Sequence, residues 1–305
     1  RTKLIGREKG YHGVNFGGVS VGGITPNRKS FGPLLPGVDH LPHTWNLDEM
    51  AFSKGQPVWG LHLADELEKI LTLQDPSTVA AVIIEPVTGS GGVIVPPVGY
   101  LQRIREICTK HNILLIFDEV ITGFGRLGDS FAATRFDVTP DIITMAKGLT
   151  GAVIPMSAVA FKNEIHDTIM QGPENMIELF HGYTYSGHPV AAAAGLATLE
   201  VYEEEGLFQK AKELEPFFED AVHSLKGENQ VVDIRNIGLM GALHFGSDPI
   251  PAAEFASKVF QHCYENDVLV RFSGEFLVLS PSLIAKPEHI ETIVDALKTA
   301  IRSIN

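Results

Sequence analysis

The sequence predicts an α/β protein with a larger domain, residues 1–199, built on a mostly parallel sheet, and a small C-terminal α/β domain, residues 200–305. Between residues 79 and 119 an apolar run, a helix-like stretch and a second apolar run follow one another. This is the pattern of a βαβ unit, in which a right-handed crossover joins two parallel strands. Beyond residue 207, helix-like stretches alternate with short apolar runs, which indicates a second, smaller α/β unit.

The individual elements follow from the spacing of the apolar residues. Residues 14–60 are rich in Gly and Pro without a steady period, so we expect packed loops there, with a mobile surface loop as the alternative. Beyond them, helical spacing predicts helices and uninterrupted apolar runs predict buried strands. In the larger domain we expect helices over 61–74, 98–112 and from 189, and strands over 79–85, 113–119, 141–147 and 154–161. In the small domain we expect helices over 208–226, 252–267 and 287–304, and strands within 233–245, 268–272 and 276–283.

Composition excludes some classes of function. The chain has 305 residues and a net charge of −13, and an acidic chain without a basic stripe is not expected to bind nucleic acid. No apolar run is long enough to span a membrane and no signal peptide is visible, which favours a cytoplasmic protein that does not act at a membrane. Both cysteines, Cys108 and Cys263, fall in helical patterns and are expected to be reduced, with one long-range disulfide as the alternative.

Three polar residues stand at the carboxyl ends of predicted strands: Glu85, Asp118 and Lys147. Ligands bind at this edge of parallel sheets, so we expect the three residues to share one site. A carboxylate at the end of a buried strand must be hydrogen-bonded, paired with a cation or protonated, and Asp118 therefore needs a partner. Lys147 is either the cation of a buried acid or a nucleophile with a lowered pKa, unless it is a surface lysine that begins a loop.

Two arrangements of Asp118 and Lys147 remain open at this point. The two side chains could form a direct ion pair between neighbouring strands. Alternatively a cofactor lies between them, because pyridoxal phosphate is held in enzymes by a lysine bonded to its aldehyde and by an acid at its ring nitrogen.

Glycine loops and histidine pairs are less specific signals. The loop 89–92 could cradle a phosphate, but no helix follows it, and the segment 123–125 lacks the third glycine of a dinucleotide fingerprint. The pairs His40/His43 and His181/His188 lack the cysteine or acid cluster of a zinc site, so no metal is expected.

Three further residues have open roles. Tyr11 and His12 are either turn residues or a platform for a stacked ring. Arg271 lies between two apolar runs, where an arginine is rarely left unpaired, and its planar fork suits a carboxylate. That carboxylate belongs either to Glu275 or to a substrate.

A known family shares these motifs. The segments IIEP (83–86), FDEVITGFGR (117–126), DIITMAKGLT (141–150) and HGYTYSGHPVAAAAGLATLE (181–200) occur in that order. Together they resemble the class III aminotransferases, which are pyridoxal phosphate enzymes of fold type I. GYHG (10–13) and LVRFSGEFLVLSPSLI (269–284) extend the resemblance to both ends of the chain. DHLPHTWNL (39–47) and IRNIGLMGAL (234–243) are most similar to the ω-amino acid:pyruvate branch, whose donors include β-alanine.

The resemblance implies a role for each site residue. Lys147 resembles the Schiff-base lysine, and Asp118 resembles the acid that keeps the pyridine nitrogen protonated. Val120 resembles the residue packed on one ring face and Tyr11 the aromatic stacked on the other, while Glu85 resembles the site glutamate near the cofactor. Thr184 resembles a threonine that reaches the phosphate from a neighbouring subunit, which implies a homodimer or a dimer of dimers. Arg271 resembles the arginine that pairs with the carboxylate of donor or acceptor.

The resemblance also defines the expected reaction. We expect the amino group of an ω-amino acid such as β-alanine to pass to pyruvate by a ping-pong mechanism. Taurine, other ω-amino acids or amines are alternative donors, and an aminomutase or decarboxylase that needs no keto acid is a related alternative. The family carries an N-terminal portion before GYHG, with a Gly-Ser loop for the phosphate. Residues 1–9 contain no such Gly-Ser loop, so we also weigh a chain that dimerises or binds a partner without holding cofactor.

Overall fold

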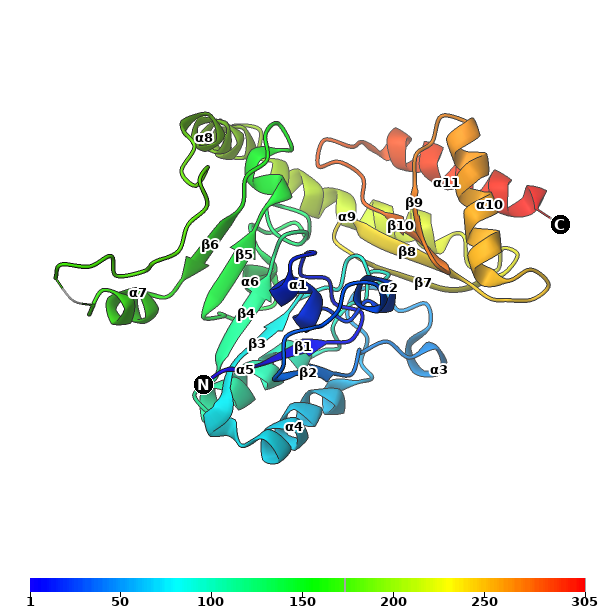
Figure 1. Ribbon diagram of the computed structural model, residues 1–305. Helices are drawn as coiled ribbons and strands as arrows, with labels where there is room; N and C mark the ends of the chain where they lie inside the picture. Colours follow the sequence, from blue (N-terminus) through cyan, green and yellow to red (C-terminus); the bar gives the residue numbers. More distant parts are fainter. Residues whose placement is uncertain (173, 305) are drawn as a thin grey trace.

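Two separate sheets organise the chain. The structure is a computed structural model and describes residues 1–172 and 174–304. A six-stranded sheet and its helices form one part, and a four-stranded sheet with three long helices forms the other (Figure 1). The α/β class expected from the sequence is confirmed.

The larger sheet is mostly parallel, as predicted. Its strand order is β2-β1-β3-β4-β5-β6, and only β6 runs antiparallel to its neighbour. The carboxyl ends of β3, β4 and β5 therefore meet at one edge of the sheet. The strands are β1 (Lys3–Arg7), β2 (Val38–Leu41), β3 (Val79–Ile84), β4 (Leu114–Asp118), β5 (Ile142–Met145) and β6 (Ala158–Phe161).

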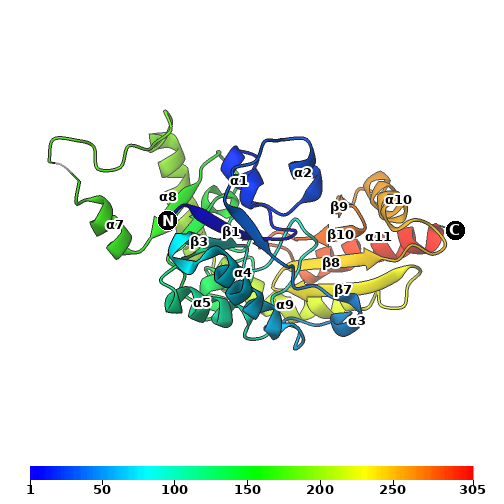
Figure 2. The same cartoon turned by 60° about the horizontal axis from the view of Figure 1, so that its bottom comes forward.

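Helices cover the larger sheet on both faces. Figure 2 shows α4 (Glu66–Gln74) and α5 (Tyr100–Lys110) on one side, and α1 (Phe16–Val21) and α2 (Thr25–Lys29) on the other. The apolar stripe of α5 is fully buried, because its residues recur at helical spacing and pack on the strands. Two short helices, α6 (Ala132–Arg135) and α7 (Asn163–Ile169), and the long α8 (Pro189–Glu204) follow. Since α8 runs across residues 199 and 200, the domain boundary between them stays a prediction.

The smaller sheet is antiparallel, with strand order β7-β8-β10-β9. Its helices bury the second apolar core, which includes Cys263. Both cysteines are buried free thiols. The strands are β7 (Val231–Ile237), β8 (Met240–Phe245), β9 (Arg271–Ser273) and β10 (Phe276–Leu279), and the helices are α9 (Leu207–His223), α10 (Ala252–Glu265) and α11 (Pro287–Ser303).

Several elements differ from expectation. The apolar stretch 233–245 forms a hairpin rather than one strand, because Gly238 turns the chain at a positive φ of 54°. Strand β1 has no counterpart in the sequence analysis, and the Gly/Pro-rich region holds β2 and α3 (Leu47–Met50) as well as α1 and α2. These elements are too short to show a period in the sequence, and tertiary contacts rather than local spacing decide where they form. The region is packed as expected, but its buried residues Val19, Leu41 and Met50 lie in α1, β2 and α3 rather than in loops.

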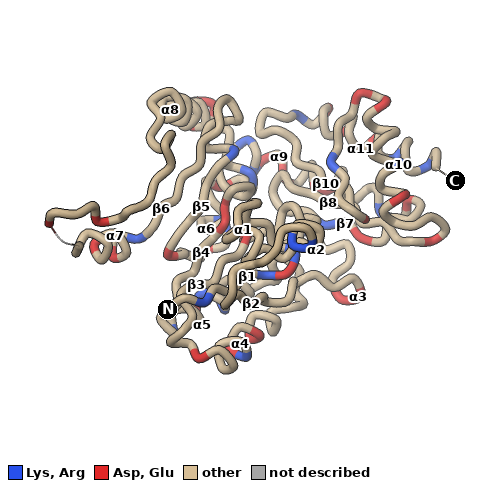
Figure 3. The backbone as a smooth tube through the Cα atoms, in the orientation of Figure 1, with Lys and Arg blue, Asp and Glu red and all other residues tan. Residues whose placement is uncertain are grey.

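Charged residues of both signs are spread over the described part of the chain. Basic and acidic residues are interspersed along the helices and loops (Figure 3). Among residues 1–172 and 174–304, no helix is both long and apolar enough to cross a bilayer.

Candidate active site

Five of the predicted residues line one cavity at the carboxyl edge of the larger sheet. The cavity measures about 390 Å³, which lies within the range of small-molecule sites. Parallel pairing aligns Ile84 with Phe117 and Asp118 with Thr144, so the residues that follow these strands converge. The predicted residues that line the cavity are Tyr11, Glu85, Asp118, Val120 and Lys147.

Asp118 is held by a histidine that the sequence analysis did not assign to the site. The His12 Nδ1–H donates to Asp118 Oδ2 at 2.8 Å, and the Val120 amide donates to Oδ1 at 3.2 Å. The His12 side chain is 2% exposed and that of Asp118 is 10% exposed. His12 follows β1, and it comes close to the end of β4 because β1 pairs with β3, the neighbour of β4. The sequence analysis did not predict β1. The GYHG turn was the one available signal.

The direct ion pair between Asp118 and Lys147 does not form. Among the residues that the structure describes, Lys147 has no carboxylate within 4.0 Å and makes no hydrogen bond through its amine. Lys147 opens the 3₁₀ turn η3 (Lys147–Thr150) at a positive φ of 45°. Such a conformation is strained for a lysine and is common where function fixes the backbone.

Burial lowers the pKa of the Lys147 amine, and the charge of Arg271 lowers it further. The charges of Asp118 and Glu85 act in the opposite direction but do not reverse the shift. The amine is therefore easier to deprotonate than that of an exposed lysine, and a neutral amine can act as a nucleophile or a base.

Replacing Lys147 by methionine should stabilise the cofactor-free protein near neutral pH. A lysine whose pKa is lowered by folding binds its proton more tightly when unfolded, so the contribution of Lys147 to wild-type stability becomes more favourable as pH rises towards about 10.4. The advantage of Lys147→Met in free energy of unfolding should thus be largest near neutral pH and shrink as pH rises. Urea denaturation of both proteins across this range measures it. A difference that is constant with pH would contradict the lowered pKa.

Glu85 is fixed by two backbone amides. Tyr11 N donates to its Oε1 and Gly89 N to its Oε2, each at 2.9 Å. The Glu85 carbonyl in turn accepts from the buried Arg7 Nη2 at 2.5 Å. Burial raises the pKa of the Glu85 carboxyl, while the His12 ring and both amides oppose this rise. The carboxyl group therefore faces the cavity in one defined position.

Glu119, the second acid of the FDE segment, has a different task. It is fully buried and accepts hydrogen bonds from Thr122 Oγ1 at 2.7 Å, Ala132 N at 2.7 Å and Ala133 N at 2.8 Å. These contacts tie the loop after β4 to the start of α6. Asp118 thus faces the cavity, whereas Glu119 holds the loop.

We expect Glu119→Ala to lower the free energy of unfolding by about 2–4 kcal/mol, because two buried amides and one hydroxyl lose their acceptor. Chemical denaturation measures the change. A loss below about 0.5 kcal/mol, the range of a neutral surface substitution, would show that Glu119 does not hold the loop.

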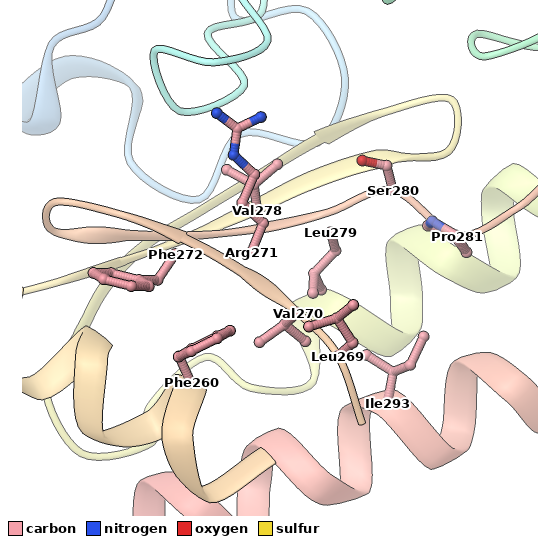
Figure 4. Close-up of a pocket in the computed structure, with 10 residues that line it drawn as sticks. All are labelled: Phe260, Leu269, Val270, Arg271, Phe272, Val278, Leu279, Ser280, Pro281 and Ile293. Carbon is pink, nitrogen blue, oxygen red and sulfur yellow. The ribbon is translucent and has the colours of Figure 1, made fainter. Parts of the chain in front are cut away.

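Arg271 lies on the edge strand β9. Figure 4 shows its guanidinium pointing away from Phe260 and Leu269, which line an apolar cavity of about 520 Å³ beneath the strand. The predicted protein partner, Glu275, instead accepts from His244 Nε2 at 3.3 Å. Within the described part of the chain, Arg271 forms no ion pair. Its charge contributes to the lowered pKa of the Lys147 amine.

Thr184 does not line the cavity within one chain. It is exposed, in the segment that precedes α8. Its role at the phosphate through a neighbouring subunit stays a prediction. The glycine loop 89–92 does not present a free phosphate cradle, since Gly89 N is taken by Glu85. In the described residues no group of three or more His, Cys, Asp or Glu could hold a metal.

The cavity fits the ring and the aldehyde of pyridoxal phosphate. The Lys147 amine has no protein partner among the described residues and has a lowered pKa, which suits a bond to an aldehyde. Asp118, fixed by His12, presents the acid that a ring nitrogen needs. Tyr11 and Val120 also line the cavity, with an aromatic and an apolar side chain that suit a flat ring.

Comparison with known proteins identifies the family. Residues 1–301 match the family described as aminotransferase class-III. The chain is 55% identical to an omega-aminotransferase of Caulobacter vibrioides, over all of this chain and 70% of that protein. It is 50% identical to a beta-alanine–pyruvate aminotransferase of Pseudomonas aeruginosa, over all of this chain and 68% of that protein.

Solved structures give the same result. A transaminase with L-alanine superposes with a TM-score of 0.93 at 33% identity, over 100% of this chain and 73% of that one. A PLP-bound amine transaminase from an uncultivated Pseudomonas species gives a TM-score of 0.91 at 38% identity, over 100% of this chain and 70% of that one. The chain therefore belongs to the class III aminotransferases, and pyridoxal phosphate is its cofactor.

Proposed function

We propose that this protein transfers the amino group of an ω-amino acid, with β-alanine as the representative donor, to pyruvate. The observation that carries the proposal is the cavity in which the Lys147 amine, with its lowered pKa, and the His12-bound Asp118 face one site. The names of relatives at about half identity, a beta-alanine–pyruvate and an omega-amino acid–pyruvate aminotransferase, support the choice of substrates.

Each residue has a defined task in this reaction. Bound pyridoxal phosphate supplies a protonated pyridine ring that withdraws the electrons left when a C–H bond beside the amine breaks. Asp118 would hold the proton at the ring nitrogen, and His12 keeps the Asp118 carboxylate oriented. The neutral Nζ of Lys147 would accept the proton from the carbon that bears the amine and would deliver it to the former aldehyde carbon of the cofactor. Tyr11 and Val120 would pack on the ring and restrain it.

Arg271 is the group that we propose for the substrate carboxylate. Its guanidinium has no carboxylate partner among the described residues and lies near enough to Lys147 to act on its pKa. A planar, bidentate donor suits both β-alanine and pyruvate, which each carry a carboxylate.

Removing this guanidinium should affect carboxylate donors alone. Because a hydrogen bond to a charged group contributes about 1.5–3 kcal/mol, Arg271→Ala should raise KM for β-alanine about 10–150-fold. The KM for butylamine, which lacks a carboxylate, should change less than about 3-fold. Steady-state kinetics with both donors measures the contrast, and an equal rise for the two donors would contradict the role of Arg271.

We further propose that the protein works as a homodimer or a dimer of dimers. Residues 174–188, which precede α8, extend away from the larger sheet (Figure 1) and expose a run of large apolar side chains. Such a surface favours burial against another chain. The exposed residues are Met176, Ile177, Leu179, Phe180, Tyr183 and Tyr185. Sedimentation velocity tests this, since a monomer at every concentration would contradict it.

The experiment for the proposed function is an assay with pyridoxal phosphate, β-alanine and pyruvate. Alanine formation that requires both substrates supports the proposal. Product formation from β-alanine without pyruvate, beyond one equivalent per active site, would instead indicate an aminomutase or decarboxylase. No reaction with β-alanine but alanine formation from taurine or a simple amine would keep the enzyme class and replace the donor.

A further inference from the structure

The loop of residues 88–94, here called the glycine loop, is closed by its own backbone. Thr88 and Ile94 exchange two hydrogen bonds, Thr88 N to Ile94 O at 3.1 Å and Ile94 N to Thr88 O at 3.0 Å. Gly92 N and Val93 N both donate to Gly89 O at 3.2 Å. The loop therefore behaves as a small ring, so a displacement at one end is passed to the other.

One end of the glycine loop lies at the active-site cavity. Gly89 N donates to Glu85 Oε2. A side chain at Gly89 would displace Ile121, because a Cβ there would lie 2.6 Å from Ile121 Cδ1. Since Ile121 also lines the cavity, Gly89 must sit close against both cavity residues to deliver its amide to Glu85.

The other end of the glycine loop is held by the smaller sheet. Arg235, on β7, donates through Nε to Gly92 O at 2.9 Å. Gly92 has a φ of +106°, and a Cβ there would lie 3.2 Å from Arg235 Nη2. Glycine at this position thus allows the guanidinium to approach the loop backbone closely.

The guanidinium of Arg235 is held in one orientation by its neighbours. Its Nη1 pairs with the Asp233 carboxylate. Asp233 also accepts from Trp45 Nε1 at 3.0 Å and from Phe52 N at 2.6 Å. The guanidinium lies 5.0 Å from the Trp45 ring, and Arg235 is 4% exposed. A buried cation with this many restraints has little freedom, so the position of Gly92 follows the position of β7.

We propose that Arg235 is a positioning residue for Glu85, which it reaches through the Gly92 carbonyl, the closed glycine loop and the Gly89 amide. The small sheet thereby controls where a carboxyl group of the active site lies. The inference rests on the proposed function only for its kinetic test, whereas its test by amide exchange needs neither substrate nor cofactor.

The first test is hydrogen exchange measured by mass spectrometry on cofactor-free protein. Arg235→Gln should speed exchange in peptides that cover residues 86–95 at least about 5-fold, because the loop loses its outer anchor. The matched control is Arg126→Gln. Arg126 is a half-buried arginine that reaches the smaller sheet by donating to the carbonyls of Leu239 and Pro281, and it has no hydrogen bond to the glycine loop among the described residues. It should leave the 86–95 peptides unchanged.

The second test is a double-mutant cycle on kcat with Glu85→Gln. Arg235→Gln should lower kcat about 10-fold when Glu85 is present and less than about 2-fold when it is replaced. The fold-change in kcat caused by Arg126→Gln should be the same with and without Glu85→Gln, because the two sites are independent. If Arg235→Gln does not fold, Gly92→Ala breaks the same contact from the loop side. Unchanged exchange at 86–95, or equal losses in both backgrounds, would overturn the proposal. If the enzyme shows no transamination, the exchange data alone decide.

Discussion

Lys147→Ala should reduce turnover of β-alanine and pyruvate by about 10⁴-fold or more, since it removes both the nucleophile for the cofactor aldehyde and the base at the reacting carbon. The structure supports this size of effect, because Lys147 is the lysine that lines the cavity. Alanine formation under saturating substrates measures it, and the fold should survive, as the side chain makes no hydrogen bond with the described residues.

The control for Lys147→Ala is the exposed Lys54, which pairs with Asp220 on the surface. Lys54→Ala should retain turnover within about 2-fold. Turnover near wild type in Lys147→Ala, with the variant folded by circular dichroism, would remove the lysine from the mechanism and with it the assignment of the cavity.

Asp118→Asn should lower kcat about 10²–10³-fold, the cost of losing one preorganised charge at a reacting group. Asparagine has nearly the same shape and can still accept the His12 hydrogen bond, but it carries no negative charge for a protonated ring nitrogen. Stability should change by less than about 1 kcal/mol. Rate and urea denaturation are measured on the same preparation.

Glu119→Gln serves as the neighbouring control for Asp118→Asn. It should lower stability but leave kcat of the folded protein within about 10-fold, because Glu119 holds the loop after β4 and does not line the cavity. The opposite pattern, with a normal rate in Asp118→Asn and a lost rate in Glu119→Gln, would exchange the two roles.

Much of the fold could be predicted because it follows local rules. The run 79–119 contains a buried strand, an amphipathic helix and a second buried strand, and β3, α5 and β4 lie where their periodicity puts them. Strands β1 and β2 are short and pair across long separations, so no local pattern marked them. The hairpin at Gly238 was missed because apolar residues flank the glycine on both sides.

The candidate site divides in the same way. Glu85, Asp118 and Lys147 could be placed together because the carboxyl ends of parallel strands meet. His12 could not be assigned, since its bond to Asp118 joins residues 106 positions apart through an unpredicted strand. The role of Gly89 was likewise hidden, because a glycine loop looks the same whether its amide meets a phosphate or a carboxylate.

The most direct measurement of the central claim is the absorbance spectrum of the protein with pyridoxal phosphate, before and after β-alanine is added without pyruvate. We predict a visible band of lysine-bound cofactor that Lys147→Ala lacks. Adding β-alanine should remove this band and produce that of pyridoxamine phosphate, and pyruvate should restore it. A lysine-bound band that does not respond to β-alanine would contradict the proposed donor, and no band at all would contradict cofactor binding by this chain.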